Sequence, residues 1–188
     1  HSFPTRRSSD LVYCPGGISY CGQYNAGNPG VTGWTVGGVS VDVVGVVGWT
    51  AADGDWSIDL SGVGAGSLSQ TFDTVAGTTY RVSFQIAGNF YDSGLKTGTA
   101  SAGGTVLPLS FDTAGRGSTT MGWESRSFTF TAAGASSTLQ FVSSVQSSAG
   151  LALDNVQVTA VPEPATALLW LAGIAGLAAA AGRQRRQR

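Results

Sequence analysis

Histidine is nearly absent from this chain: His1 is the only one in 188 residues. Without further imidazoles the sequence cannot build a Ser-His-Asp or Cys-His catalytic arrangement, nor a histidine-based metal cluster. Cations are also scarce, because residues 12–160 carry four basic and nine acidic side chains, a net charge of −5. Nucleic-acid binding depends on neutralising phosphates with Lys and Arg, so we expect no nucleic-acid partner.

A glycoside-active enzyme would need two carboxyl groups facing each other across a cleft. Glu124 is the only glutamate between residues 12 and 160 and could pair with an aspartate. It follows Trp123 at the start of a predicted strand, where a solvated edge position is the simpler interpretation. We therefore predict no catalytic residues and keep a surface glycoside-active enzyme as an alternative function.

Only 11% of the residues are charged, against about 25% in an average globular protein, whereas glycine accounts for 28 of 188. This composition suits an exported β-protein, and the length allows one domain of about 150 residues plus a tail.

Short β-type runs alternate with glycine-rich turns from Val31 onward. These runs are Trp34 to Val36, Val39 to Val44, Trp56 to Leu60, Gly66 to Thr74, Thr79 to Gly88, Lys96 to Ala102, Thr105 to Phe111, Glu124 to Thr131, Ser137 to Ser143 and Ala152 to Thr159.

Apolar residues alternate with polar ones in several runs, as in Tyr80-Arg81-Val82-Ser83-Phe84-Gln85-Ile86, which is typical of a strand with one buried face. No segment before Pro164 has an apolar stripe of helical period. The sequence therefore predicts an all-β fold, an antiparallel β-sandwich or jelly roll.

Cys14 and Cys21 lie close together in the loop-like segment Cys-Pro-Gly-Gly-Ile-Ser-Tyr-Cys. In an exported protein such a pair is expected to form a small-loop disulfide. A zinc site would need four ligands, and the chain offers no further cysteine. The spacing is also too wide for a thioredoxin-like redox motif.

Three aspartates stand inside apolar strand segments: Asp42, Asp59 and Asp154. Aspartate is disfavoured in strands, so each needs a hydrogen-bond partner or an ion. The simpler interpretation is that each accepts hydrogen bonds from neighbouring loop amides. Asp53, Asp55 and Asp59 also place three hard oxygen ligands close together in sequence, which makes Ca²⁺ the one candidate cofactor. A polar turn followed by an amide-capping aspartate is at least as good an interpretation of these three.

Aromatic side chains could form a platform on which sugar rings stack: Trp34, Trp49, Trp56, Trp123, Phe90 and Tyr91. Most tryptophans of a sandwich lie in its core. Asn89, Phe90, Tyr91 and Asp92 fall in a predicted loop after the strand that begins near Tyr80, where binding groups tend to lie. They are the candidate ligand-binding residues, with polysaccharide as the candidate partner.

The C-terminal tail consists of Pro162-Glu163-Pro164, an uncharged apolar run from Ala165 to Gly182, and the arginines Arg183, Arg185, Arg186 and Arg188. A helix over 165–182 would span about 27 Å, close to the roughly 30 Å of a bilayer core. Its uniformly apolar surface disfavours a buried helix of a soluble domain. Positive charge stays in the cytoplasm, so the residues before Pro162 are expected outside it.

This tail resembles the PEP-CTERM sorting signal of exported bacterial proteins. The resemblance implies that an exosortase, a membrane-embedded cysteine protease, recognises Pro162-Glu163-Pro164 and cuts nearby. The chain would then be anchored in the inner membrane only in transit, before reaching the cell surface or extracellular matrix. A plain membrane anchor would give no reason for the Pro-Glu-Pro sequence.

The body of the chain resembles the choice-of-anchor C domain, which is related to the DUF642 family. The ordered pieces that carry the resemblance are Thr32 to Val36, Ser40 to Val44, Ala52 to Gly62, Gly66 to Thr74, Gly77 to Tyr80, Phe84 to Asn89, Met121 to Trp123, Phe128 to Ala132 and Leu153 to Val156. The resemblance implies a galactose-binding-like jelly roll, a fold that often carries carbohydrate-binding modules.

Residues 1–11 resemble the in-frame translation of a DNA sequencing adapter and are set aside. We accordingly expect the native signal peptide to be missing and the first strand of the domain to be truncated. The expected organisation is a β-sandwich domain over residues 12–160 followed by a sorting signal over 161–188. The expected function is that of a non-catalytic, exported surface or matrix protein that binds carbohydrate; a purely structural matrix component is a further alternative.

Overall fold

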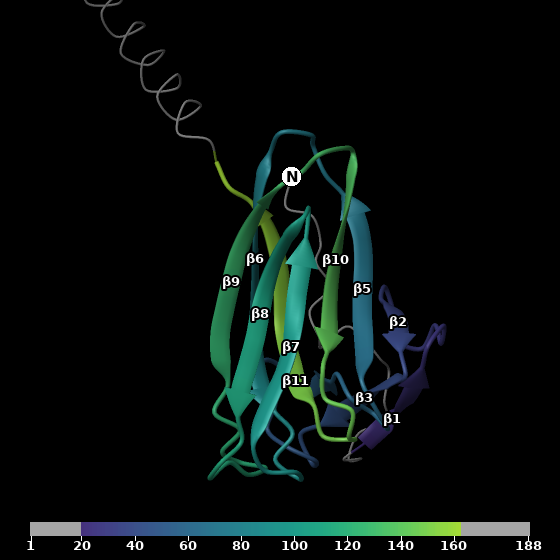
Figure 1. Ribbon diagram of the computed structural model, residues 1–188, viewed down its shortest axis with the longest axis vertical. Helices are drawn as coiled ribbons and strands as arrows, with labels where there is room; N and C mark the ends of the chain where they lie inside the picture. The colour runs from purple at the N-terminus through teal and green to yellow at the C-terminus, as the bar shows by residue number, and fades with distance from the viewer. Residues whose placement is uncertain (1–19, 163–188) are drawn as a thin grey trace, which may run out of the picture.

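The computed structural model describes residues 20–162, which form eleven β-strands in two antiparallel sheets (Figure 1). None of these residues belongs to a helix with the length and apolarity needed to cross a bilayer. The predicted helix over 165–182, Glu163, Pro164 and the four C-terminal arginines lie outside the described residues, as do residues 1–11 and Cys14. The prediction of an all-β sandwich is confirmed.

The strands are β1 Tyr20–Asn25, β2 Thr35–Gly38, β3 Ser40–Gly45, β4 Trp56–Asp59, β5 Gly66–Asp73, β6 Thr79–Gly88, β7 Leu95–Ala102, β8 Thr105–Asp112, β9 Glu124–Thr131, β10 Ser136–Ser143 and β11 Leu151–Ala160. One sheet has six strands in the order β1-β3-β4-β11-β6-β9, and the other has five in the order β2-β5-β10-β7-β8. Because β11 lies between β4 and β6, segments distant in sequence become neighbours in the six-stranded sheet.

The hydrophobic core lies between the two sheets. In β6, Tyr80, Val82, Phe84 and Ile86 are at most 2% exposed, as their alternation with polar residues predicts. Phe84 meets Phe141 of the opposite sheet edge-on, with ring centroids 5.0 Å apart. Burying each such side chain contributes about 1.5–3 kcal/mol, so this row of β6 is a principal source of stability.

Strand β1 was not among the predicted β-type runs, which begin after Val31, and it includes the last two residues of the segment described as loop-like, Tyr20 and Cys21. Tyr20–Asn25 pairs with β3 at the edge of the six-stranded sheet, with an irregularity in register between Tyr20 and Gly22. Glycine and asparagine are poor strand formers, so the pairing partner, rather than local propensity, makes this segment a strand. Cys21 lies within β1, and its predicted disulfide with Cys14 stays a prediction.

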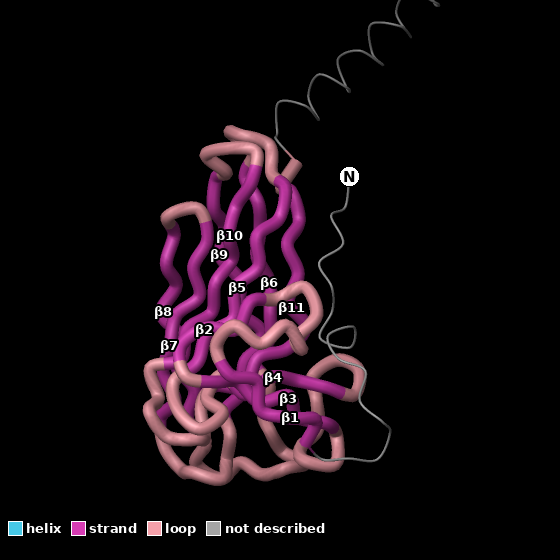
Figure 2. Tube along the Cα trace, turned by 90° about the vertical axis from the view of Figure 1, so that its right-hand side faces the viewer, coloured by secondary structure: helices cyan, strands magenta, loops and turns pink. Residues whose placement is uncertain are grey.

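The two ends of the sandwich differ. Short turns at one end join β5 to β6, β7 to β8 and β9 to β10; the tightest, Gly103-Gly104, has positive φ at both residues, as a two-residue hairpin requires. Longer loops gather at the other end, opposite the C-terminal end of β11 (Figure 2). These loops are residues 46–55, 89–94, 113–123 and 144–150. The rigid strands therefore present four loops together on one end.

Candidate functional site

A pocket of about 320 Å³ opens among these loops. Strands β3 and β4 supply one wall, and the loops after β3, β4, β6 and β10 supply the rest. Its lining residues are Asp42, Val44, Gly48, Trp49, Asp59, Gly62, Asn89, Tyr91 and Ser148. We call it the loop-end pocket. It includes Asn89 and Tyr91, two of the four residues predicted to bind ligand.

Asp59 lies at the buried side of this pocket and is 1% exposed. Its Oδ1 accepts hydrogen bonds from the backbone N–H groups of Ser61 (2.9 Å) and Gly150 (3.1 Å). Removal from water raises the pKa of Asp59 to about 7, an effect that the charge of the neighbouring Asp42 reinforces and the hydrogen bonds oppose. The carboxyl thus joins the end of β4 to the start of β11.

Asn89 connects Asp59 to the exposed loop. Its Nδ2 donates to Asp59 Oδ2 at 2.7 Å, and its Oδ1 accepts from the backbone N–H of Tyr91 at 3.0 Å. The backbone N–H of Asn89 donates to the carbonyl of Gly150. With these partners and 7% exposure, Asn89 is held in place rather than free to search for a ligand. It positions the start of the 89–94 loop.

Tyr91 is the exposed aromatic side chain of the pocket, at 76% relative accessibility. Its ring stacks on Phe90 with centroids 4.7 Å apart, and Phe90 in turn packs edge-on against the buried Trp49. The Trp49 indole N–H donates to Ser57 Oγ at 2.7 Å, which fixes the bottom of this stack. The predicted loop position of Asn89 to Asp92 is confirmed, since β6 ends at Gly88 and β7 begins at Leu95.

The other predicted platform residues lie in or against the core. Trp34 is buried, and Trp56 and Trp123 are partly buried against the core. Asp92 is not part of the pocket lining; its Oδ2 lies 3.5 Å from Nζ of the buried Lys96. Thr113 Oγ1 accepts from the N–H of Gly94, so the far end of the loop is tied to the loop after β8. The 89–94 loop is therefore fixed at both ends, at Asn89 and at Gly94, and Tyr91 between them is held in an exposed position.

The calcium interpretation of Asp53, Asp55 and Asp59 is not supported. Among residues 20–162, no group of three or more His, Cys, Asp or Glu side chains is placed so that it could hold a metal ion. Asp59 points to the interior, where Ser61, Gly150 and Asn89 occupy both its oxygens, whereas Asp55 is exposed. The three aspartates are close in sequence, but their carboxylates do not converge on one point, because β4 carries Asp59 away from the 46–55 loop.

The amide-capping interpretation of the strand aspartates is confirmed for Asp59 and Asp154. Asp154 is 1% exposed, and its Oδ2 accepts from the N–H groups of Ala52 (2.7 Å) and Asp53 (3.0 Å). Its Oδ1 accepts from the N–H of Asn155. The carboxylate therefore fastens the 46–55 loop, which brings Gly48 and Trp49 to the pocket.

Sequence reasoning did not identify Ser148 as a pocket residue, nor Asp42 as the neighbour of Asp59; Trp49 was among the possible platform residues and does line the pocket. Asp42 and Asp59 are directly opposite each other in the β3–β4 pair. The only sequence signal for this was two aspartates in apolar strands. Glu124, the carboxyl weighed for catalysis, instead forms an ion pair with Arg126, two residues along β9.

Comparisons with known proteins agree with this architecture. Residues 19–159 match the family profile described as "Protein of unknown function (DUF642)", and residues 160–186 match the PEP-CTERM protein-sorting motif. The match at 160–186 confirms the sorting signal recognised in the tail, which is a signal of exported proteins that are sorted to the cell surface.

Among curated proteins, halomucin of Haloquadratum walsbyi is 33% identical over 143 residues, which is 74% of this chain but only 2% of halomucin. Among solved structures, TmCBM61 in complex with β-1,4-galactotriose has a TM-score of 0.50 at 19% identity, covering 69% of this chain and 90% of that one. A family 35 carbohydrate-binding module from Clostridium thermocellum has a TM-score of 0.49 at 10% identity, with 74% and 98% covered. The first of these structures shows the shared jelly-roll fold.

Proposed function

The chain belongs to the DUF642 family, and from this premise we propose that it is a non-catalytic, exported surface or extracellular-matrix protein that binds carbohydrate through the loop-end pocket. The observation that carries the proposal is the exposed Tyr91 ring, stacked on Phe90 at the rim of a pocket lined by carboxyl, amide and hydroxyl groups. Sugar recognition combines an aromatic face for the C–H side of the ring with fixed polar groups for the hydroxyls.

The sorting motif supports the rest of the proposal. The β-sandwich over residues 12–160 is the functional domain, and residues 161–188 are a sorting signal that is removed after export. An exosortase is the proposed partner. The segment 165–182 first spans the inner membrane, and the cytoplasmic residues are Arg183, Arg185, Arg186 and Arg188. The exosortase then cuts near Pro162-Glu163-Pro164. Mass spectrometry of the surface protein should then find no peptide from Leu168 to Arg188; recovery of that tail would indicate a simple anchor.

Retention on immobilised polysaccharides tests the binding. β-1,4-Galactan is the first probe, because TmCBM61, which shares the fold, was solved with β-1,4-galactotriose. We expect Tyr91→Ala to weaken binding at least about tenfold, as loss of a central aromatic contact does. Val106→Ala, which trims a side chain 60% exposed on β8, is the control and should bind normally. Equal binding by both variants would place the ligand elsewhere.

Two alternatives make different predictions. A structural matrix component would bind no polysaccharide in the panel. A glycoside-active enzyme would release reducing ends from one of them, and Asp42 with Asp59 would be its carboxyl pair. Asp59 argues against catalysis, because it is buried with both oxygens engaged and so is placed to hold loops rather than to reach a glycosidic oxygen.

A further inference from the structure

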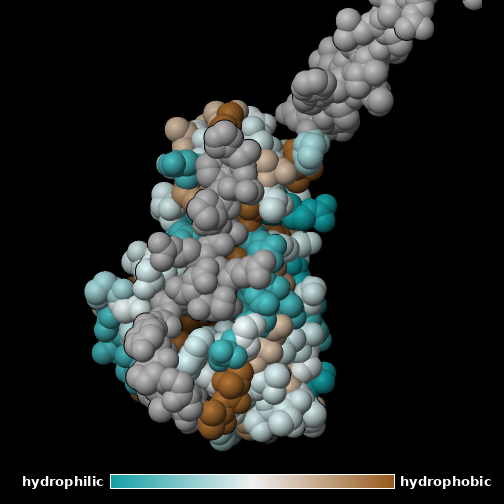
Figure 3. Space-filling model, turned by 180° about the vertical axis from the view of Figure 1, so that it is seen from behind, coloured by the Kyte–Doolittle hydropathy of each residue, from teal (hydrophilic) through white to brown (hydrophobic). Residues whose placement is uncertain are grey.

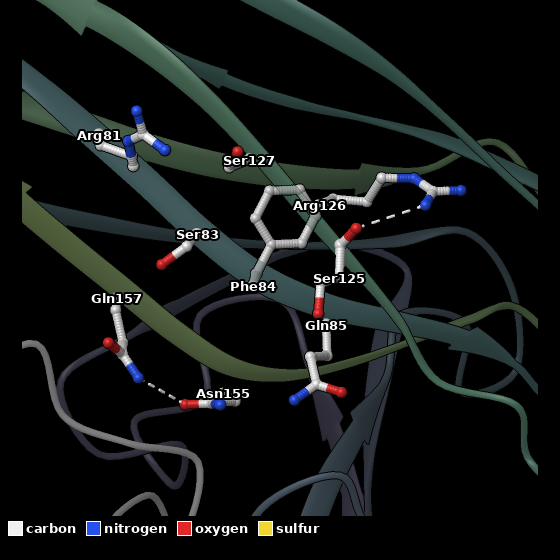
Figure 4. Close-up of a pocket in the computed structure, with 9 residues that line it drawn as sticks. All are labelled: Arg81, Ser83, Phe84, Gln85, Ser125, Arg126, Ser127, Asn155 and Gln157. Carbon is white, nitrogen blue, oxygen red and sulfur yellow. Dashed lines mark hydrogen bonds between the residues drawn. The ribbon is translucent and has the colours of Figure 1, made fainter.

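A second hollow, of about 330 Å³, lies on the outer face of the six-stranded sheet, away from the loop-end pocket. It spans three adjacent strands, β9, β6 and β11 (Figure 4). We call it the sheet-face hollow; its lining residues are Arg81, Ser83, Phe84, Gln85, Ser125, Arg126, Ser127, Asn155 and Gln157. Seen from behind, this part of the molecule carries hydrophilic side chains (Figure 3).

The charge of this lining is opposite to that of the domain. Residues 12–160 have four basic and nine acidic side chains, yet the hollow has no acid in its lining and carries the guanidinium of Arg81 on the outer face. Arg126 also borders the hollow, but it is directly opposite the buried Phe84 in the β6–β9 pair, so its side chain leaves β9 toward the other face of the sheet. Arg126 has a partner in Glu124. The side chain of Arg81 is exposed and, within residues 20–162, makes no ion pair. A positive site is thus maintained on an acidic protein.

A β-bulge in β11 shapes one wall of the hollow. The pairing of β11 with β6 shifts register between Asp154 and Gln157, and Asn155 adopts φ +47°, the only positive φ of a non-glycine residue in the described chain. The extra residue keeps Val156 in the core while Asn155 and Gln157 both line the hollow. Gln157 Nε2 donates to Asn155 Oδ1 at 2.8 Å, which fixes both carboxamides (Figure 4).

The lining groups define the class of ligand. Guanidinium groups bind carboxylates through charge-assisted hydrogen bonds, and the amides and serine hydroxyls suit sugar hydroxyls. The one aromatic residue, Phe84, is 2% exposed and offers no face for stacking a neutral ring. We propose that the sheet-face hollow binds an acidic polysaccharide, one built from uronic acids, with Arg81 contacting the sugar carboxylate.

This site is independent of the loop-end pocket, so the two can be tested separately. The probe is polygalacturonate, measured by affinity electrophoresis with the whole chain, alongside neutral β-1,4-galactan and dextran sulfate. We expect Arg81→Gln to weaken polygalacturonate binding about tenfold, the effect of losing one charge-assisted contact. Gln157→Ala should weaken it less, and Tyr91→Ala should leave it unchanged.

Arg116→Gln is the matched control. It removes the same charge from the 113–123 loop, where Arg116 lies over the Phe111 ring, outside the hollow. A thermal unfolding scan of each variant confirms that the exposed substitution leaves the fold intact. Retained binding in Arg116→Gln together with loss in Arg81→Gln supports the proposal.

Three results would overturn it: no binding of polygalacturonate by the unaltered chain, equal loss in Arg81→Gln and Arg116→Gln, or dextran sulfate binding as tightly as polygalacturonate. The last two would mean general attraction of polyanions. Loss of polygalacturonate binding in Tyr91→Ala alone would move the acidic sugar to the loop-end pocket, which would overturn this site while supporting the proposed function.

Discussion

The side-chain amide of Asn89 donates a 2.7 Å hydrogen bond to Oδ2 of Asp59, a residue 30 positions earlier in the chain. Both side chains are buried, and Asn89 in turn accepts from the N–H of Tyr91. A carboxyl in the interior therefore controls, through one amide, the backbone that presents the exposed ring. The stability of the domain and the geometry of the loop-end pocket depend on the same contact.

Replacing Asn89 with Ala should cost both stability and binding. It leaves Asp59 Oδ2 and the N–H of Tyr91 without their partner, and a buried polar group without a partner costs about 1–3 kcal/mol. Urea denaturation measures the loss. Asn28→Ala is the control, because Asn28 Oδ1 accepts a similar bond from Gly30 N–H at an exposed position and should cost less than about 1 kcal/mol. Equal losses of unfolding free energy in Asn89→Ala and Asn28→Ala would mean that burial does not strengthen the Asn89 contact.

The raised pKa of Asp59 predicts an unusual pH dependence. Its carboxyl binds a proton more tightly in the folded state (pKa about 7) than in the unfolded chain (about 3.8), so folding favours the protonated form. The free energy of unfolding should therefore decrease as the pH rises from about 4 to about 7, and level off above that.

Chemical denaturation at a series of pH values measures this slope. Residues 20–162 contain no histidine, so no imidazole of the described sandwich titrates in the same range. Asp59→Asn should remove the slope between about pH 5 and pH 7, although the variant is less stable because its amide would face the Nδ2 of Asn89. A slope that persists in Asp59→Asn would assign it to another group.

Asp154 should be a larger contributor to stability than its position in an apolar strand suggests. Asp154→Ala leaves the N–H groups of Ala52, Asp53 and Asn155 without their acceptor, and we expect a loss of about 2–4 kcal/mol. Asp55→Ala, at an exposed position of the same loop, should change stability by no more than about 0.5 kcal/mol. Similar losses in both variants would contradict the fastening role of Asp154.

The sequence predicted the strands well where burial imposes a period of two. In β6 the alternation from Tyr80 to Ile86 reports which side chains face the core, so the strand and its inward face follow directly. Strand β1 carries no such signal, because an edge segment with Gly22 and Asn25 becomes a strand only through pairing with β3. A local sequence pattern carries no information about a pairing strand that comes from another part of the chain.

The candidate site was predictable only in part for the same reason. Asn89 and Tyr91 follow a recognisable strand, so their loop position could be read locally. The contact between Asn89 and Asp59 requires β11 to lie between β4 and β6, an order set by the whole topology. The calcium hypothesis for Asp53, Asp55 and Asp59 failed on this point: nearness in sequence was taken for nearness in space, while the true partners of Asp59 come from residues 61, 89 and 150.

The bulge at Asn155 gives a final prediction, because backbone conformation and side-chain contact can be separated there. Asn155→Gly loses the hydrogen bond from Gln157 but adopts φ +47° without strain, so stability should change by less than about 1 kcal/mol. Asn155→Val loses the same bond and also forces a β-branched residue into the left-handed region, which costs about 1–3 kcal/mol more.

Thermal unfolding of the two variants measures the difference, and polygalacturonate binding gives a second readout. Val at 155 favours extended backbone, which would remove the bulge and exchange the inward and outward positions that follow it in β11. Val156 and Gln157 would then compete for the core, so binding at the sheet-face hollow should fall further in Asn155→Val than in Asn155→Gly. Equal stability and equal binding in both variants would mean that the side-chain bond, and not the left-handed backbone, holds this wall of the hollow.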